Sequence, residues 1–148
     1  MDDATNRKLS GSERETEKIA AKLAATLSPG DVVALFGGMG MGKTAFVRGL
    51  AAGLGLCSDD VCSPTFALVN EYTHPGMKSL YHFDFYRVED EHSLLSTGFY
   101  EYLESGGILA CEWSERIAGL LPPGTINVRI SLGMDEGHRV IETWRAGG

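Results

Sequence analysis

The residues of this chain most suited to chemistry stand at positions 37–44, which read GGMGMGKT. Gly37, Gly42, Lys43 and Thr44 match G-x-x-x-x-G-K-[ST], the pattern of a phosphate-binding loop. The glycines allow the backbone to turn its N–H groups toward a phosphate, and the following helix adds the positive end of its dipole. A lysine at this position contacts the β- and γ-phosphates of a nucleotide, and the threonine hydroxyl binds Mg2+. The stretch therefore predicts a site for a nucleoside triphosphate.

Two other interpretations of this glycine-rich stretch are weaker. A dinucleotide-binding G-x-G-x-x-G turn that began at Gly38 would need glycine at the position of Lys43. A chance glycine-rich turn would need no particular neighbours. Here the apolar run VVALF at 32–36 predicts a buried parallel strand that leads into the stretch, and residues 44–54 predict a helix that follows it. This context favours the phosphate-binding loop.

A site of this kind also needs a carboxylate to hold the metal ion. Residues 107–111, GILAC, predict a second buried strand that runs into Glu112, which suits that role. An apolar strand that ends in glutamate is common, so a solvated strand end is the alternative for Glu112. Asp84, in the stretch HFDFYR at 82–87, is suited to position or deprotonate the water that attacks the γ-phosphate, or to bind the metal indirectly. A structural ion pair with Arg87 is the alternative for Asp84.

The cysteines and the charge of the chain limit its possible partners. The three cysteines include no C-x-x-C pair, which argues against zinc and favours reduced thiols in the cytoplasm. No apolar run is long enough to cross a membrane. The formal net charge is -7, and no cluster of lysine and arginine stands out along the sequence, so direct contact with nucleic acid is not expected. If nucleic acid is involved, a partner is expected to touch it.

The elements that must position these residues alternate between helices and apolar strands. A capping box at 12–15, SERE, predicts the start of a helix that ends at Pro29-Gly30. This order predicts one α/β domain over 1–148, a three-layer P-loop NTPase-type fold with a mostly parallel central sheet and antiparallel additions. Residues 1–11 are polar and are expected to be flexible. Further strands are expected at 66–72, 80–84, 125–132 and 139–144, and one or two short helices at 89–104.

Five segments of the chain together resemble the bacterial TsaE family, formerly called YjeE. They are, in order, Ser12-Glu13 with Thr16, the loop at 37–44, Ser-Pro-Thr at 63–65, HFDFYR at 82–87 and Glu112-Trp113. The resemblance runs from about Ser12 to Trp144, nearly the whole chain. Members of this family are small P-loop ATPases that are required for making threonylcarbamoyladenosine in tRNA. The resemblance therefore implies an ATP-hydrolysing protein of that modification machinery.

The resemblance also implies roles for individual residues. It places Glu13 and Thr16 near the base and sugar of ATP, and Arg139 near the nucleotide. It implies that residues 63–65 act as a switch loop and that Trp113 lies near the site or a partner surface. The residues then expected to bind ATP are Glu13, Thr16, Met39, Gly40, Met41, Gly42, Lys43, Thr44, Ala45, Asp84 and Arg139.

Catalysis, cofactor and partners follow from the same resemblance. Lys43, Asp84 and Glu112 are expected to be catalytic, with ATP as substrate and Mg2+ bound by Thr44 and Glu112. The implied partners are TsaD and TsaB, ASKHA-fold subunits that carry out threonylcarbamoyl transfer, and tRNA is then contacted only through them. Hydrolysis is expected to be weak in the isolated protein, stimulated by the partners, and used to reset their complex. All of this implies a cytoplasmic protein.

The phosphate-binding loop departs from the family at two positions. The family usually has aspartate or glutamate where this chain has Gly38, and a small residue where it has Met41. Because the backbone of such a loop makes the phosphate contacts, we expect the phosphate site to be intact. Any polar contact that the acid makes with the switch loop or a partner would be missing.

Three rival functions are weighed against the ATPase. A small-molecule kinase should have an arginine-rich lid, whereas Arg116 is the only basic residue between Glu112 and Arg129. A GTPase-like switch should have an Asn-Lys-x-Asp stretch to select guanine, and the sequence has none. A nucleotide-dependent scaffold, in which ATP binding and not hydrolysis drives assembly, remains an alternative.

Overall fold

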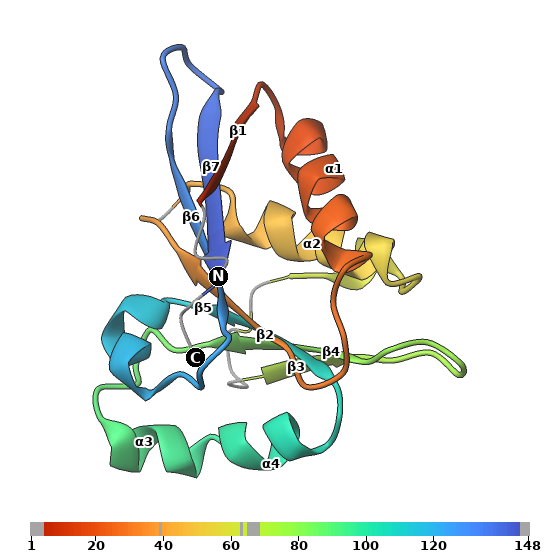
Figure 1. The fold of residues 1–148 in the computed structure, drawn as a ribbon, viewed down its shortest axis with the longest axis vertical. Coiled ribbons are helices and arrows are strands. Elements are labelled where there is room, and N and C mark those ends of the chain that lie inside the picture. The colour runs from red at the N-terminus through yellow and green to blue at the C-terminus, as the bar shows by residue number, and fades with distance from the viewer. Residues whose placement is uncertain (1–4, 39, 63, 65–68, 146–148) are drawn as a thin grey trace.

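A mixed β-sheet with helices on both faces forms the fold (Figure 1). The computed structural model describes residues 5–38, 40–62, 64 and 69–145. The strands in these ranges are β1 (Asn6–Ser10), β2 (Val32–Phe36), β3 (Val69–Tyr72), β4 (Leu80–Asp84), β5 (Ile108–Glu112), β6 (Ile126–Leu132) and β7 (Arg139–Arg145). The helices are α1 (Glu13–Ala24), α2 (Lys43–Gly53), α3 (Glu91–Ser96) and α4 (Phe99–Glu104), with 3-10 helices η1 (Ser58–Asp60) and η2 (Ser114–Leu120).

The seven strands form one sheet in the order β1-β7-β6-β2-β5-β4-β3. The four central strands, β6, β2, β5 and β4, pair in parallel, and β3, β7 and β1 pair antiparallel at the two edges. Helices α1 and α2 cover one face, and α3, α4 and η2 cover the other. This arrangement confirms the expected three-layer α/β fold with antiparallel additions. Of the strand expected at 66–72, residues 66–68 lie outside the described ranges.

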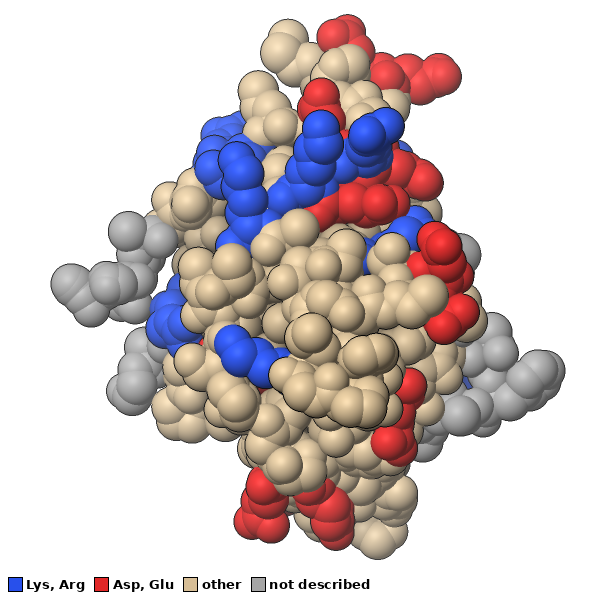
Figure 2. Space-filling view, turned by 90° about the vertical axis from the view of Figure 1, so that its right-hand side faces the viewer, with Lys and Arg blue, Asp and Glu red and all other residues tan. Residues whose placement is uncertain are grey.

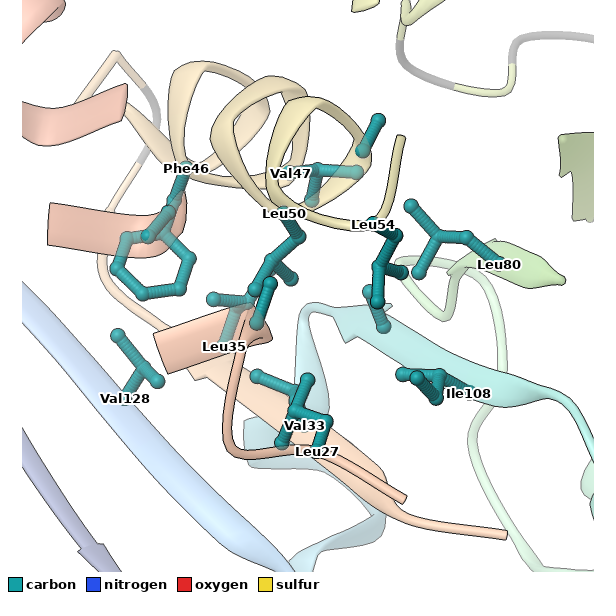
Figure 3. Packing of buried hydrophobic residues seen from close by; sticks show 14 of the residues in the cluster. Leu27, Val33, Leu35, Phe46, Val47, Leu50, Leu54, Leu80, Ile108 and Val128 are labelled. Atoms are coloured by element: carbon teal, nitrogen blue, oxygen red, sulfur yellow. The ribbon is translucent and has the colours of Figure 1, made fainter. Parts of the chain in front are cut away.

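Apolar side chains bury β2 on both of its faces. Figure 3 shows Phe46 and Leu50 of α2 packed toward Leu35 of β2, and all three side chains are fully buried. On the other face a second cluster includes Phe83 of β4 and Phe99 of α4. A strand that is apolar along its whole length is typical of such a double-sided position. The carboxyl end of β2, where the glycine-rich stretch begins, is therefore held by packing on both sides.

Helix α1 begins where its capping box predicts. The hydroxyl of Ser12 accepts a hydrogen bond from the backbone N–H of Glu15 at 3.1 Å, and Glu15 Oε1 accepts one from the N–H of Gly11 at 2.6 Å. The end differs from the expectation, because α1 stops at Ala24 and does not reach Pro29. The hydroxyl of Thr26 donates to the carbonyl of Leu23 at 2.7 Å and so satisfies one of the last carbonyls of the helix.

The expectation that residues 1–11 are flexible is wrong for Asn6–Ser10. These residues form β1, which pairs with β7 from Asn6 opposite Thr143 to Ser10 opposite Arg139. Four of the five side chains of β1 are exposed, so the strand buries too little apolar surface to show in the sequence pattern. Backbone hydrogen bonds to β7, which do not depend on side-chain type, hold it instead.

Basic side chains that are scattered in the sequence gather on the α1 side of the molecule. Arg14, Lys18 and Lys22 recur every fourth residue, and all three are exposed. Lys22 and Lys8 of β1 line one groove of about 220 Å3 between α1 and the sheet. Figure 2 shows lysine and arginine side chains grouped on the upper part of its face, beside acidic ones. Four-residue spacing aligns these cations only once the helix has formed, and Glu15 and Glu17 stand between them, so the expectation that the chain offers no basic surface for nucleic acid stays a prediction.

The helices of the described ranges are too short or too polar to cross a membrane.

The packing of α1 against α2 predicts that Gly49 tolerates no side chain. A Cβ at Gly49 would overlap the carbonyl of Glu17 and lie 2.7 Å from the Cβ of Ala20. We expect Gly49→Ala to lower the free energy of unfolding by about 2–3 kcal/mol, because two helix backbones must move apart. Urea unfolding measures this. Gly119→Ala is the control, since no atom lies within 4 Å of its added Cβ. Equal stability of the two variants would contradict the close packing.

Candidate functional site

The glycine-rich stretch joins the end of β2 to the start of α2, as expected of a phosphate-binding loop. Gly37, Gly40 and Gly42 have φ angles of 149°, 79° and 109°, which residues with a side chain rarely adopt. At Gly37 a Cβ would also lie 2.7 Å from the carbonyl oxygen of Ile130 in β6. Glycine is therefore required at Gly37 both for its backbone angle and for the close approach of β6. Met39 lies outside the described residues.

A cavity of about 410 Å3 opens between this loop and the carboxyl ends of β4 and β5. It brings together residues from four separate segments of the chain. Arg48 is a lining residue that the sequence motifs missed. It stands one helical turn after Thr44 on α2, and its Nη1 lies 3.3 Å from Oε2 of Glu17. The lining residues are Glu13, Gly40, Gly42, Lys43, Thr44, Ala45, Arg48, Asp84, Glu112 and Trp113.

The ammonium group of Lys43 is held inside the site by two contacts. Its Nζ donates a hydrogen bond to the carbonyl of Gly37 at 2.7 Å and lies 3.6 Å from the centroid of the Trp113 ring. The side chain is only 5% exposed. A hydrogen bond and a cation–π contact replace part of the water that this charge has lost. Lys43 therefore rests against its own loop, within reach of the cavity.

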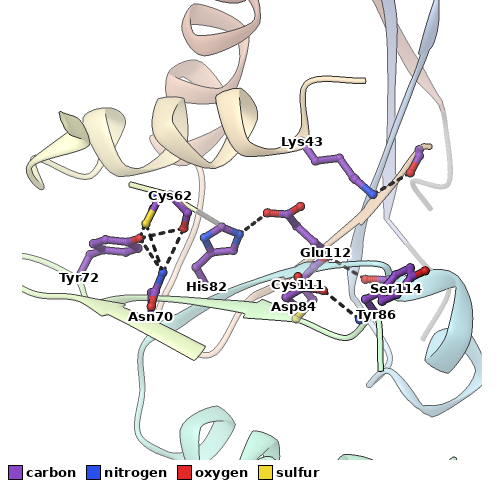
Figure 4. Close-up of polar contacts among 11 residues, drawn as sticks. Lys43, Cys62, Asn70, Tyr72, His82, Asp84, Tyr86, Cys111, Glu112 and Ser114 are labelled. Atoms are coloured by element: carbon purple, nitrogen blue, oxygen red, sulfur yellow. Dashed lines mark hydrogen bonds and ion pairs between the residues drawn. The ribbon is translucent and has the colours of Figure 1, made fainter. Parts of the chain in front are cut away.

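The two candidate carboxylates stand side by side at one edge of the sheet. Asp84 and Glu112 are direct partners in the parallel pairing of β4 and β5. Oε2 of Glu112 lies 2.5 Å from Nε2 of His82, and Oδ1 of Asp84 accepts a hydrogen bond from the N–H of Tyr86 at 2.9 Å (Figure 4). Glu112 is 4% exposed, so it is not a solvated strand end. Asp84 is bonded to the backbone of its own turn and, among the described residues, forms no ion pair with Arg87.

The turn after β5 also contacts the phosphate-binding loop. Trp113 has φ 60° and ψ 38°, and it is the one residue other than glycine with positive φ in the described ranges. This turn places the Trp113 ring over Lys43 and lets Oε2 of Glu115 accept a hydrogen bond from the N–H of Gly37 at 3.0 Å. Tyr86 packs edge-on against Trp113, with 5.0 Å between the ring centroids. The motifs of the sequence gave no signal for Glu115, because the contact joins positions 78 residues apart.

Three residues that the resemblance assigned to ATP do not line this cavity. Thr16 is buried beneath the start of α1, where its hydroxyl lies 2.7 Å from the hydroxyl of Ser10. Arg139 holds the outer side of the loop, since its Nε donates to the carbonyl of Met41 at 3.1 Å and its Nη2 to that of Gly40 at 3.4 Å. Whether Thr16, Met41 and Arg139 contact a nucleotide stays a prediction.

The expected switch loop at 63–65 is described only at Pro64, which is buried; the other two residues lie outside the described ranges. Within those ranges no three histidine, cysteine or acidic side chains are grouped as a metal site. A magnesium ion in a nucleotide site needs fewer protein ligands, because phosphate and water oxygens supply the rest.

The position of Lys43 predicts a pH-dependent cost in stability. Burial lowers the pKa of Lys43 below its ordinary value of 10.5, although the carboxylates of Glu112, Glu115 and Asp84 oppose the shift. Between the lowered pKa and 10.5 the unfolded chain holds one more proton than the folded one, so stability rises with pH there. We expect Lys43→Met to raise the free energy of unfolding at neutral pH, and this gain to shrink as the pH approaches 10.5.

Urea unfolding of both proteins across this pH range measures the gain. Lys22→Met, at an exposed site on α1, is the control and should show no such trend. A gain for Lys43→Met that stays constant with pH would contradict the assignment of the cost to the buried charge.

Comparison with known proteins agrees with this geometry. The family model described as "Threonylcarbamoyl adenosine biosynthesis protein TsaE" matches residues 10–141. The tRNA threonylcarbamoyladenosine biosynthesis protein TsaE of Bacillus subtilis is 40% identical over 129 residues, 87% of this chain and 79% of its own length. That of a Nostoc species is 42% identical over 134 residues, 88% and 80% of the two chains.

A solved structure shares the fold as well. The crystal structure of YdiB from Bacillus subtilis matches with a TM-score of 0.77 and 32% identity, and the match covers 98% of this chain and 87% of that one. The family match spans most of the chain, and the strand order places the expected loop and carboxylates around one cavity. The chain therefore belongs to the TsaE family, with its P-loop NTPase-type fold.

Proposed function

We propose that this protein binds and hydrolyses ATP with Mg2+ as an accessory protein of tRNA threonylcarbamoyladenosine biosynthesis. One observation carries the proposal. A single cavity joins Lys43 and Thr44 of the phosphate-binding loop to Asp84 and Glu112 at the ends of two neighbouring strands. The names of the relatives supply the pathway. The partners proposed are TsaD and TsaB, the compartment is the cytoplasm, and hydrolysis resets the partner complex.

The loop and the start of α2 provide the site for the phosphates. The first N–H groups of any α-helix have no carbonyl of the preceding turn to bond, and they carry the positive end of the helix dipole. Lys43 begins this helix and lines the cavity. In the proposed complex its Nζ leaves the carbonyl of Gly37 for the β- and γ-phosphates. The exchange replaces one hydrogen-bond acceptor of the ammonium group with others.

The side chains of the cavity fit a magnesium ion. Thr44 and Glu112 both line the cavity, and a hydroxyl and a carboxylate are hard oxygen ligands that suit Mg2+. The ion, when bound, offsets negative charge on the phosphates. Asp84 has one oxygen held by the N–H of Tyr86, which orients the carboxylate and leaves the other oxygen to position or deprotonate the attacking water.

Contact with tRNA is proposed to be indirect. The net charge of -7 disfavours an RNA phosphate backbone over most of the surface, and Glu15 and Glu17 stand between the cations of α1. The partner subunits are proposed to hold the tRNA and to raise the rate of hydrolysis.

Phosphate release from ATP and GTP, with and without the partner subunits, tests the proposal. We expect hydrolysis of ATP that rises with the partners. Lys43→Ala, Asp84→Ala and Glu112→Ala should each lower the rate about 100-fold or more, because each removes a group that faces the transferred phosphate. Lys22→Ala, at an exposed site that does not line the cavity, is the control and should leave the rate unchanged. Transfer of phosphate to a small molecule would contradict the proposal.

Nucleotide binding can be followed separately in the Trp144→Phe variant. Trp113 is then the remaining tryptophan, and its ring contacts the ammonium group of Lys43. We expect its fluorescence to change when ATP binds. Partner assembly that needs ATP but survives Asp84→Ala would favour the scaffold instead.

Gly38 offers a test of the departure from the family pattern. It is exposed, has an ordinary φ, and no atom lies within 4 Å of an added Cβ, so Gly38→Asp should fold normally. We expect ATP affinity to stay the same, because the backbone binds the phosphates, and the partner-stimulated rate to change. Gly38→Ala is the control for the side chain alone. An unchanged stimulated rate would show that the departure is neutral.

A further inference from the structure

We propose that His82 is a positioning residue that holds Glu112 for the metal ion. Its bond to Oε2 leaves Oε1 as the oxygen that Glu112 presents to the cavity. The inference rests on the proposed function, because it assigns His82 a part in metal binding at that same site. Figure 4 shows the carboxylate of Glu112 between the ring of His82 and the side chain of Lys43.

The register of the sheet brings His82 to Glu112. His82 on β4 lies opposite Ala110 on β5, and Asp84 lies opposite Glu112. Residues two apart in a strand share a face, so His82, Asp84 and Glu112 all stand on the side of the sheet that carries the phosphate-binding loop. Glu112 therefore has a second carboxylate directly beside it and a histidine diagonally behind it. The histidine is the neighbour that can donate a hydrogen bond.

Burial makes this contact a fixed one. His82 is 0% exposed, and the distance of 2.5 Å between Nε2 and Oε2 leaves no room for water between them. A glutamate side chain that is anchored at one oxygen loses most of its freedom to rotate. Metal-binding carboxylates and imidazoles are commonly held in this way by a neighbour that does not itself touch the ion, and loss of the neighbour costs metal affinity.

The surroundings of Nδ1 indicate which ring nitrogen of His82 donates to Glu112. Nδ1 of His82 is buried and has no hydrogen-bond partner among the described residues. A proton on Nδ1 would be a buried donor without an acceptor, which is costly. A proton on Nε2 fits the contact with Glu112, so Nε2–H donates and the carboxylate of Glu112 accepts. Within the described chain, Glu112 is therefore the only residue to which the ring of His82 is hydrogen-bonded.

A core histidine with a purely structural role is the competing interpretation, and matched variants separate the two. Glutamine extends far enough to place an amide N–H near the position of Nε2, whereas asparagine is too short to reach it. Leucine fills part of the space and donates nothing. If the role is purely structural, the loss of stability should depend on the size and polarity of the side chain that replaces His82. If the role is positioning, metal affinity should be high in the variants that can donate a hydrogen bond to Glu112 and low in those that cannot.

Binding of Mn2+, a paramagnetic stand-in for Mg2+, to the protein with a non-hydrolysable ATP analogue is the measurement, read by electron paramagnetic resonance. We expect His82→Leu to weaken Mn2+ binding by about 10- to 100-fold and His82→Gln to recover most of the loss. Affinity for the analogue without metal, followed through Trp113 in the Trp144→Phe background, should not change. Glu112→Gln combined with His82→Leu should bind Mn2+ no more weakly than Glu112→Gln alone, because the two act through one carboxylate.

Three results would overturn the inference. In the first, His82→Leu folds and binds Mn2+ like the wild type. In the second, the two losses add in the double variant. The third applies if His82→Leu does not fold, so that His82→Gln and His82→Asn are compared instead. In that case, equal Mn2+ affinity of these two variants overturns the inference. A wild-type protein that binds no metal–nucleotide complex would instead contradict the proposed function itself, and that result is visible before any variant is made.

Discussion

The parallel pairing of β2, β5 and β4 is the constraint on which the site depends. Parallel strands end at the same edge of a sheet, so the phosphate-binding loop after β2, Glu112 at the end of β5 and Asp84 at the end of β4 meet there. The register is held by side chains that are buried on both faces of β2. A slip of one residue would send Asp84 and Glu112 to the opposite face. The packing that fixes the register of these strands therefore also fixes the geometry of the site.

The loop itself is held by two side chains that do not line the cavity. Glu115 accepts a hydrogen bond from the N–H of Gly37 at its beginning, and Arg139 donates to the carbonyls of Gly40 and Met41 further along. The turn after β5 that supplies Glu115 contains the positive φ of Trp113, whose ring contacts Lys43. Strained backbone is commonly found where a site requires it. Here it lets one short turn contact both the loop and its lysine.

Much of the fold was predictable because the deciding signals are local. The apolar runs of β2 and β5, the capping box at Ser12 and the glycine pattern each reflect a preference of a few consecutive residues. Other features of the fold leave no local signal. The polar segment Asn6–Ser10 forms an edge strand that backbone bonds to β7 hold, and Arg14, Lys18 and Lys22 become neighbours only on a formed helix.

The sequence by itself determined the glycine-rich loop between β2 and α2, with Lys43 and Thr44 at its end, and the family to which the chain belongs. Only the tertiary structure decided how the distant residues act on that loop. It brought Arg48 to the cavity, Glu115 to Gly37 and His82 to Glu112, and it directed Thr16 and Arg139 away from the cavity lining. The physical reason is that these contacts depend on strand register and on one turn with positive φ, which no short stretch of sequence encodes.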